Sequence, residues 1–136
     1  MPVYHDIAIK RIGSDYQFEF GRTPARMHRK GHLLIHQDRA NIVIKLKVIT
    51  PGFTFQNDGT GDGTQALFIS NDPARTPKDC FRDYGVFTAP TLNPPAFTVL
   101  TFGSRNDDGE VYFYQLNLWD ADLKKLAICD PIIVNR

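Results

Sequence analysis

Glutamate is almost missing from this chain of 136 residues. Only Glu19 and Glu110 carry it, and the other 13 of the 15 acidic residues are aspartates. Glutamate is a good helix former, whereas aspartate competes for nearby backbone groups and suits turns. Valine, isoleucine, threonine and the aromatic residues, which fit a pleated strand, make up about a third of the chain. The composition therefore excludes a fold built on long helices.

Cysteine and long apolar runs are also scarce. The two cysteines, Cys80 and Cys129, are too few for a disulfide framework, and in a reducing compartment such a pair is most often two buried thiols. No window is apolar over the length of a membrane span, and the N-terminal MPVYHDIAIKR has no signal-peptide core. We therefore expect a single domain over residues 1–136, located in the cytoplasm, with no membrane partner.

An excess of charge of one sign is lacking as well. Lysine and arginine total 16 against 15 acidic residues, for a formal net charge of +1. Such a balance creates no global field that would attract nucleic acid, so we expect no nucleic-acid partner. None of the three serines lies in a G-x-S-x-G motif. We therefore assign no catalytic residue and expect no cofactor.

The sequence does contain apolar and polar residues that alternate with a period of two. The pattern is clearest in IVIKLKV, residues 42–48. It also runs through VYHDIAI and DYQFEF, joined by Gly13-Ser14-Asp15, and through FTVLTF and VYFYQLNLW, with Asp108-Gly109 between them. Such alternation predicts half-buried strands, and the two short polar joints predict two hairpins.

These strands predict an all-β fold. We expect an antiparallel two-sheet sandwich of about seven or eight strands, because no crossover helix separates them. The turn Asp120-Ala121-Asp122 would lead into a further strand, LKKLAIC. At most one short helix is predicted, at residues 76–84, where Thr76 can cap it and Pro77 suits its first position.

The segment HRKGHLLIH places His28, His32 and His36 four residues apart, so the three rings share one face of a helix or a strand. A zinc or copper site is one interpretation. The neighbouring cations oppose it, since no acidic residue occurs between Phe20 and Gln37. We expect instead a solvated strand edge or a site for an anionic ligand. The candidate anion-binding residues are Arg22, Arg26, Arg29, Lys30 and His32.

The loop FQNDGTGDGTQ imitates the start of a calcium-binding loop. Oxygen donors occur at Asp58, Thr60 and Asp62, and Gly63 occupies the sixth position. The twelfth position, which requires a bidentate acid, is Ile69. We therefore expect a turn between two strands in this loop and no calcium site.

The chain ends in WDADLKKLAICDPIIVNR, which combines an aromatic strand, an aspartate-rich turn and a closing D-P-x-I-x-N. This end resembles that of the DP-EP family of uncharacterised bacterial proteins and, more loosely, that of the AidA/PixA inclusion-body proteins. The resemblance rests on Asp130, Pro131, Ile133 and Asn135. It implies an immunoglobulin-like sandwich from a bacterium, with no catalytic residues to carry over. From the residues alone, Asp130-Pro131 suits a bend or bulge in a terminal strand.

These patterns favour a non-enzymatic function. We expect a small binding or self-associating module, which forms a homo-oligomer through outward-facing aromatic residues such as Phe113 and Trp119. Tyr112 and Tyr114 would lie on the opposite face of the same strand. The alternative is a metal- or cysteine-dependent hydrolase that uses His28, His32 and His36 or the Cys80 region.

Overall fold

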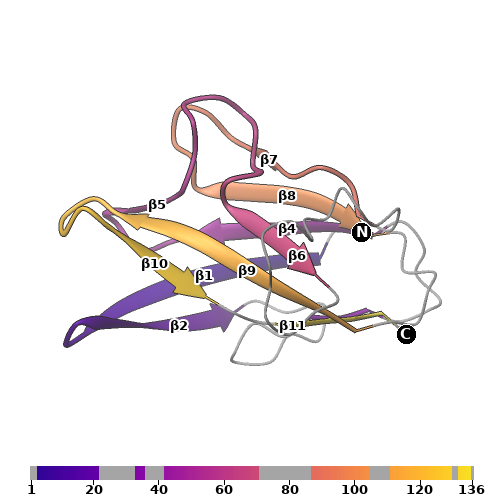
Figure 1. The fold of residues 1–136 in the computed structure, drawn as a ribbon, viewed down its shortest axis with the longest axis horizontal. Coiled ribbons are helices and arrows are strands. Elements are labelled where there is room, and N and C mark those ends of the chain that lie inside the picture. Colours follow the sequence, from indigo (N-terminus) through magenta and orange to yellow (C-terminus); the bar gives the residue numbers. More distant parts are fainter. Residues whose placement is uncertain are drawn as a thin grey trace.

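The computed structural model describes residues 3–21, 33–35, 42–70, 87–104, 111–129 and 132–135, and every regular element in these ranges is a strand (Figure 1). The strands form two sheets that lie face to face over a shared core. Within these ranges, no helix has the length and apolar character needed to cross a membrane. The all-β prediction is confirmed. The short helix expected at residues 76–84 lies outside the described residues.

The first sheet, here called sheet A, has five strands. They are arranged in the order β2-β1-β4-β8-β7. Their bounds are β1 (Val3–Ile12), β2 (Asp15–Gly21), β4 (Ile42–Val48), β7 (Thr91–Leu92) and β8 (Val99–Ser104). The hairpin between β1 and β2 turns at Gly13, whose φ of 61° suits glycine, so the first predicted hairpin is confirmed.

The second sheet, sheet B, is organised around one long strand, β9 (Val111–Asp120). Two short strands pair with each edge of β9: β10 and β11 on one edge, and β5 and β6 on the other. β3 then pairs with β11. Their bounds are β3 (Leu33–Ile35), β5 (Phe53–Phe55), β6 (Leu67–Ser70), β10 (Lys125–Cys129) and β11 (Ile132–Asn135).

Three details of the predicted architecture are wrong. The described residues contain eleven strands, more than the seven or eight expected, because β9 is paired in pieces along both edges. The sheets are mixed, since β1 runs parallel to β4 and β3 runs parallel to β11. The expected hairpin between FTVLTF and VYFYQLNLW does not form, because β8 pairs within sheet A and β9 lies in sheet B. Alternation shows which side chains are buried, but it does not identify the neighbouring strand.

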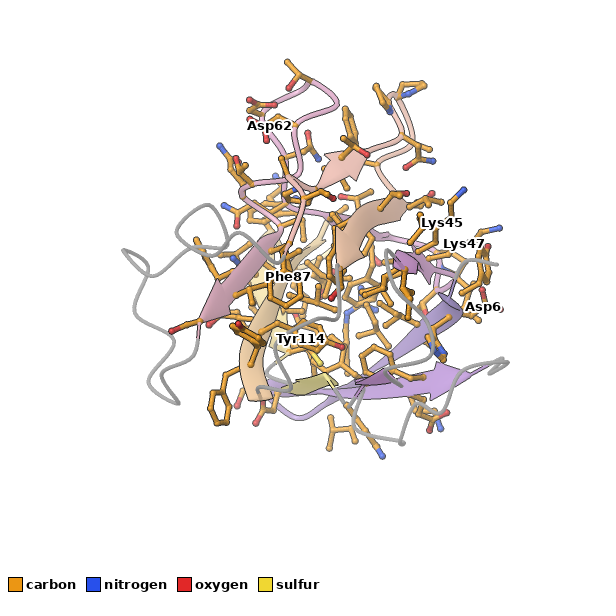
Figure 2. The ribbon with its side chains drawn as sticks, turned by 90° about the vertical axis from the view of Figure 1, so that its right-hand side faces the viewer. Asp6, Lys45, Lys47, Asp62, Phe87 and Tyr114 are labelled. Carbon is orange, nitrogen blue, oxygen red and sulfur yellow. The ribbon has the colours of Figure 1, made fainter. Side chains whose placement is uncertain are left out.

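The core lies between the two sheets and follows the predicted alternation. Along β4 the residues at 42, 44, 46 and 48 are buried, and so are Tyr112 and Tyr114 on β9. Tyr114 lies inside the sandwich in Figure 2. The largest fully buried side chains come from both sheets: Ile7, Ile44, Leu46, Phe55, Leu67, Ile69, Leu100, Phe102, Tyr114, Leu116 and Leu118. This shared core leaves each sheet with one outer face, and it is these outer faces that differ in chemistry.

Candidate functional site

The outer face of sheet B carries no charge at any outward position whose side chain the structure describes. We call this surface the uncharged face. Its residues are Thr54, Phe68, Phe113, Gln115, Asn117, Trp119, Leu126 and Ile128. Trp119, Leu126 and Ile128 keep 38%, 37% and 48% of their surface exposed. As predicted, Trp119 is exposed and Phe113 is partly exposed. Tyr112 and Tyr114, on the opposite face of β9, are buried.

Cross-strand pairing gathers the apolar side chains into a compact group. Trp119 lies between Thr54 on β5 and Leu126 on β10, and Ile128 lies beside Asn117. Side chains directly opposite each other on one sheet face are close enough to contact. Trp119, Leu126 and Ile128 therefore form one continuous patch rather than three scattered exposed residues, and such patches mark interaction sites.

The two amide side chains of the uncharged face, Gln115 and Asn117, form hydrogen bonds within the protein. The amide of Gln115 donates a hydrogen bond to Asn117 Oδ1 at 2.8 Å, and Asn117 Nδ2 donates to the carbonyl of Gln65 at 3.1 Å. The backbone of Asn117 also bonds to Gln56 and Ala66. Asn117 thereby fixes the long connection between β5 and β6. A surface that covers this face does not need to supply partners for these two amides.

Sheet A presents a contrasting outer face. Asp6, Lys45 and Lys47 project together from its side of the molecule in Figure 2, and Lys10 forms an exposed ion pair with Glu19 at 3.6 Å. Charged residues are thus common on one outer face and missing from the described positions of the other. Charges on sheet surfaces maintain solubility and oppose association. The outer face of sheet B is therefore better suited than that of sheet A to contact another protein surface.

A second notable cluster closes one end of the sandwich around Asp120, at the C-terminal end of β9. Asp120 is fully buried and accepts hydrogen bonds from Arg11 Nε (2.8 Å), Arg11 Nη2 (2.6 Å) and the Tyr16 hydroxyl (2.7 Å). It also accepts bonds from the backbone amides of Asp122 and Leu123. The cluster joins the β1–β2 hairpin of sheet A to the β9–β10 turn of sheet B. Sequence analysis missed it, because its partners are far apart along the chain.

The electrostatics of this cluster indicate a structural role. Hydrogen bonds from the Arg11 guanidinium hold the pKa of Asp120 well below its usual range, despite burial. Burial and the bond to Asp120 raise the pKa of Tyr16 to about 12, and the Asp120 partner raises the pKa of Arg11. Each group is thereby held in its ordinary charge state at neutral pH. A carboxylate with five donors around it has little capacity left to accept a proton from a substrate.

His5 is another buried polar residue that sequence analysis overlooked. Its ring is fully buried on β1, with Nδ1 3.3 Å from the carbonyl oxygen of Gly21. Nε2 has no hydrogen-bond partner among the residues described. Burial lowers the pKa of His5, which outweighs the opposing effects of the Gly21 carbonyl and Asp6. A neutral imidazole in an apolar core fits this environment, and in the described part of the chain no other side chain joins His5 in a metal site.

Most of the sites expected from sequence lie outside the described residues. This holds for the histidines, His28, His32 and His36, for Cys80, and for Asp130 and Pro131. It also holds for the basic side chains of the candidate anion site, Arg22, Arg26, Arg29 and Lys30. β3 (Leu33–Ile35) lies within this segment and runs parallel to β11, the strand that carries Asn135. Cys129, the other cysteine, is buried at the end of β10.

The aspartates of the calcium-like loop are occupied by their own backbone. Asp58 Oδ1 accepts hydrogen bonds from the amide and hydroxyl of Thr60, which lowers the pKa of Asp58, and Asp62 Oδ1 accepts from the amide of Thr64 at 2.9 Å. These are ordinary turn-forming contacts. The loop lies between β5 and β6, as expected. Across the ranges given above, no group of three His, Cys, Asp or Glu side chains is placed to hold a metal ion.

No protein-family model matches this chain, and no curated protein matches it. The functional argument therefore depends on the surfaces described above.

Proposed function

We propose that this protein is a small, non-enzymatic binding module that self-associates through the uncharged face of sheet B. The observation that carries the proposal is the segregation of charge between the two outer faces. A sheet exposed to water on one side ordinarily carries polar and charged residues on that side. On sheet B the described outward positions instead offer Trp119, Leu126 and Ile128 in one patch.

A second copy of the same chain suits this face better than a charged partner. A two-fold contact brings the same patch from both subunits together, so the patch must be complementary to itself. A strongly charged patch would repel its own copy, whereas an uncharged patch does not. The aromatic and aliphatic side chains supply area that two copies can bury in common.

The size of the face predicts weak association. β9 is ten residues long, and sheet B is three strand positions wide where β5 or β6, β9, and β10 or β11 lie side by side. At about 4.8 Å between strands and about 3.4 Å per residue, the face covers roughly 500 Å². Stable complexes bury about 800 Å² per partner. We therefore expect a concentration-dependent dimer rather than a permanent one.

Sedimentation velocity tests the proposal with a matched pair of variants. Ile128 and Ile49 are similarly exposed, at 48% and 51%, but only Ile128 lies on the uncharged face. We expect the wild type to dimerise as concentration rises, Ile128→Lys to remain monomeric, and Ile49→Lys to behave like the wild type. A wild type that stays monomeric at millimolar concentration would overturn the proposal.

Trp119 supplies an independent measurement, because it is the chain's single tryptophan. If association covers it, its fluorescence emission shifts to shorter wavelength as protein concentration rises. The shift should be absent in Ile128→Lys. An emission maximum that does not change with concentration, in a sample that dimerises, would place the contact elsewhere on the molecule.

We also propose finer assignments of fold and family. The sandwich would be of the immunoglobulin-like class, and the chain a bacterial, cytoplasmic relative of the DP-EP proteins, as its C-terminal residues suggest. The mixed strand pairing argues for a variant rather than a standard immunoglobulin topology, whose sheets are antiparallel. An experimental structure that includes Asp130 and Pro131 would test these assignments.

A further inference from the structure

A pocket of about 380 Å³ lies on sheet A, at the end where β4 and β8 meet the segment that leads into β7. Its lining includes Val43, Thr88, Ala89, Thr91, Thr101 and Gly103. The volume falls within the range of about 300–1,000 Å³ that small-molecule sites occupy. The pocket is separate from the uncharged face, because its residues belong to sheet A and its edge.

Gly103 shapes this pocket. Its amide donates a hydrogen bond to Thr88 Oγ1 at 2.7 Å, and the Thr88 amide donates to the Gly103 carbonyl at 3.0 Å. These two bonds hold the Thr88 segment against β8. A Cβ atom at position 103 would lie 3.0 Å from Thr88 Oγ1 and 3.3 Å from its methyl group. Any side chain there would displace the wall, so the close approach depends on glycine.

A row of polar side chains crosses the outer face beside the apolar lining. In the strand register, Thr101 is opposite Thr91 on one side and opposite Lys45 on the other. Adjacent positions in such a row are within contact distance of one another. The described structure gives no hydrogen-bond partner to the Thr91 and Thr101 hydroxyls, and no acidic partner to Lys45. The row therefore places Lys45 beside two threonines whose hydroxyls are unbonded in the described structure. Asp62, whose Oδ1 accepts from the Thr64 amide, follows Thr91 at the far end of the row.

We propose that this pocket binds a small carboxylate with an apolar body. The carboxylate would accept hydrogen bonds from Thr101, Thr91 and the Lys45 ammonium, and the body would lie over Gly103 against Val43 and Ala89. Lysine provides a point charge that suits an anionic oxygen, and the threonine hydroxyls orient it. Val43, 43% exposed in the free protein, would be covered by the ligand. The proposal requires no contact on sheet B.

Octanoate is the probe, with octanol as its uncharged counterpart. Two-dimensional ¹H–¹⁵N spectra of the full chain would be recorded as each compound is added. We expect saturable shifts from octanoate at residues 43, 88–91 and 101–104, and at least tenfold weaker binding of octanol. Equal binding of the two compounds, or no saturable shift with octanoate, would overturn the proposal.

Lys45 and Lys47 provide the matched control, since both face outward on β4 and Lys47 is two residues further from the pocket. Lys45→Met should weaken octanoate binding at least tenfold, whereas Lys47→Met should change it less than twofold. Thr101→Val, which keeps the shape of the side chain, should also weaken binding. Equal losses in both lysine variants would show a general charge effect and refute the assigned site. Shifts centred on Trp119 would assign octanoate to the uncharged face instead.

Discussion

The guanidinium of Arg11 donates two hydrogen bonds to the buried carboxylate of Asp120, at 2.8 and 2.6 Å, across 109 residues of sequence. Arg11 lies near the end of β1 in sheet A, and Asp120 ends β9 in sheet B. Arg11 also lies over the Phe53 ring, with its Cζ 4.8 Å from the ring centroid. The pair therefore connects the two layers at one end of the sandwich.

Asp120→Asn should destabilise the fold. The substitution removes the charge that Arg11 pairs with and places an amide donor against existing donors, and breaking a buried pair is costly. We expect a melting temperature lower by several degrees. Asp122→Asn, at a carboxylate whose side chain is 68% exposed, should cause a much smaller change. Thermal unfolding followed by circular dichroism measures both, and equal effects would contradict the special role of Asp120.

The same pair predicts an acid dependence of stability. Because the folded pKa of Asp120 is depressed, its contribution is present above the unfolded value and lost as pH falls through the folded value. The unfolded value for an aspartate is about 3.9. The difference in stability between wild type and Asp120→Asn should therefore be constant near neutral pH and shrink below about pH 4. Urea titrations at several pH values test this, and a difference that grows in acid would be inconsistent with it.

Tyr16 should ionise later than an ordinary tyrosine. Burial and the hydrogen bond to Asp120 raise the pKa of Tyr16 to about 12. In a spectrophotometric titration of the phenolates, Tyr16→Phe should remove a component that titrates near this value. Asp120→Asn should move that component to lower pH, because the neighbouring negative charge is gone. A titration curve unchanged by Tyr16→Phe in that range would refute the assignment.

His5 should make the fold less stable as pH falls from neutral. The pKa of His5 is lowered by burial, so the unfolded chain binds a proton more readily than the folded one. Stability due to this group is therefore present above the unfolded value of about 6.5 and is lost progressively below it. His5→Leu should reduce the pH dependence of unfolding in that range. The remaining histidines are common to both proteins, so a pH dependence unchanged by the substitution would contradict the prediction.

Substitutions of Leu46 and Leu126 should distinguish a loss of core packing from a loss of self-association. Leu46 is fully buried, whereas Leu126 is 37% exposed on the uncharged face. Leu46→Ala should lower the free energy of unfolding by about 2–5 kcal/mol, because it leaves a cavity. Leu126→Ala should change monomer stability by less than about 0.5 kcal/mol and weaken self-association. Chemical denaturation of dilute protein and sedimentation of concentrated protein measure the two effects, and the reverse pattern would contradict the assignments.

Some of this structure follows directly from local sequence. The inward set on β4, the inward Tyr112 and Tyr114, and the outward Phe113 and Trp119 all follow from period-two alternation. The β1–β2 turn follows from Gly13 and its polar neighbours. The scarcity of glutamate correctly indicated a fold of strands. These features depend on neighbours within a few residues, which is why a single sequence is enough to predict them.

The tertiary structure alone decided which strands are neighbours and which side chains meet. Alternation is the same whether β8 pairs with β9 or faces it across the core, so the sequence could not show that they belong to different sheets. The uncharged face required the register that places Leu126 beside Trp119, and the proposed pocket required Lys45, Thr101 and Thr91 in one row. Arg11 meets Asp120 only after both sheets are packed. The physical reason is that burial patterns are encoded locally, whereas pairing is decided by competition among many distant strands for the same edges and the same core.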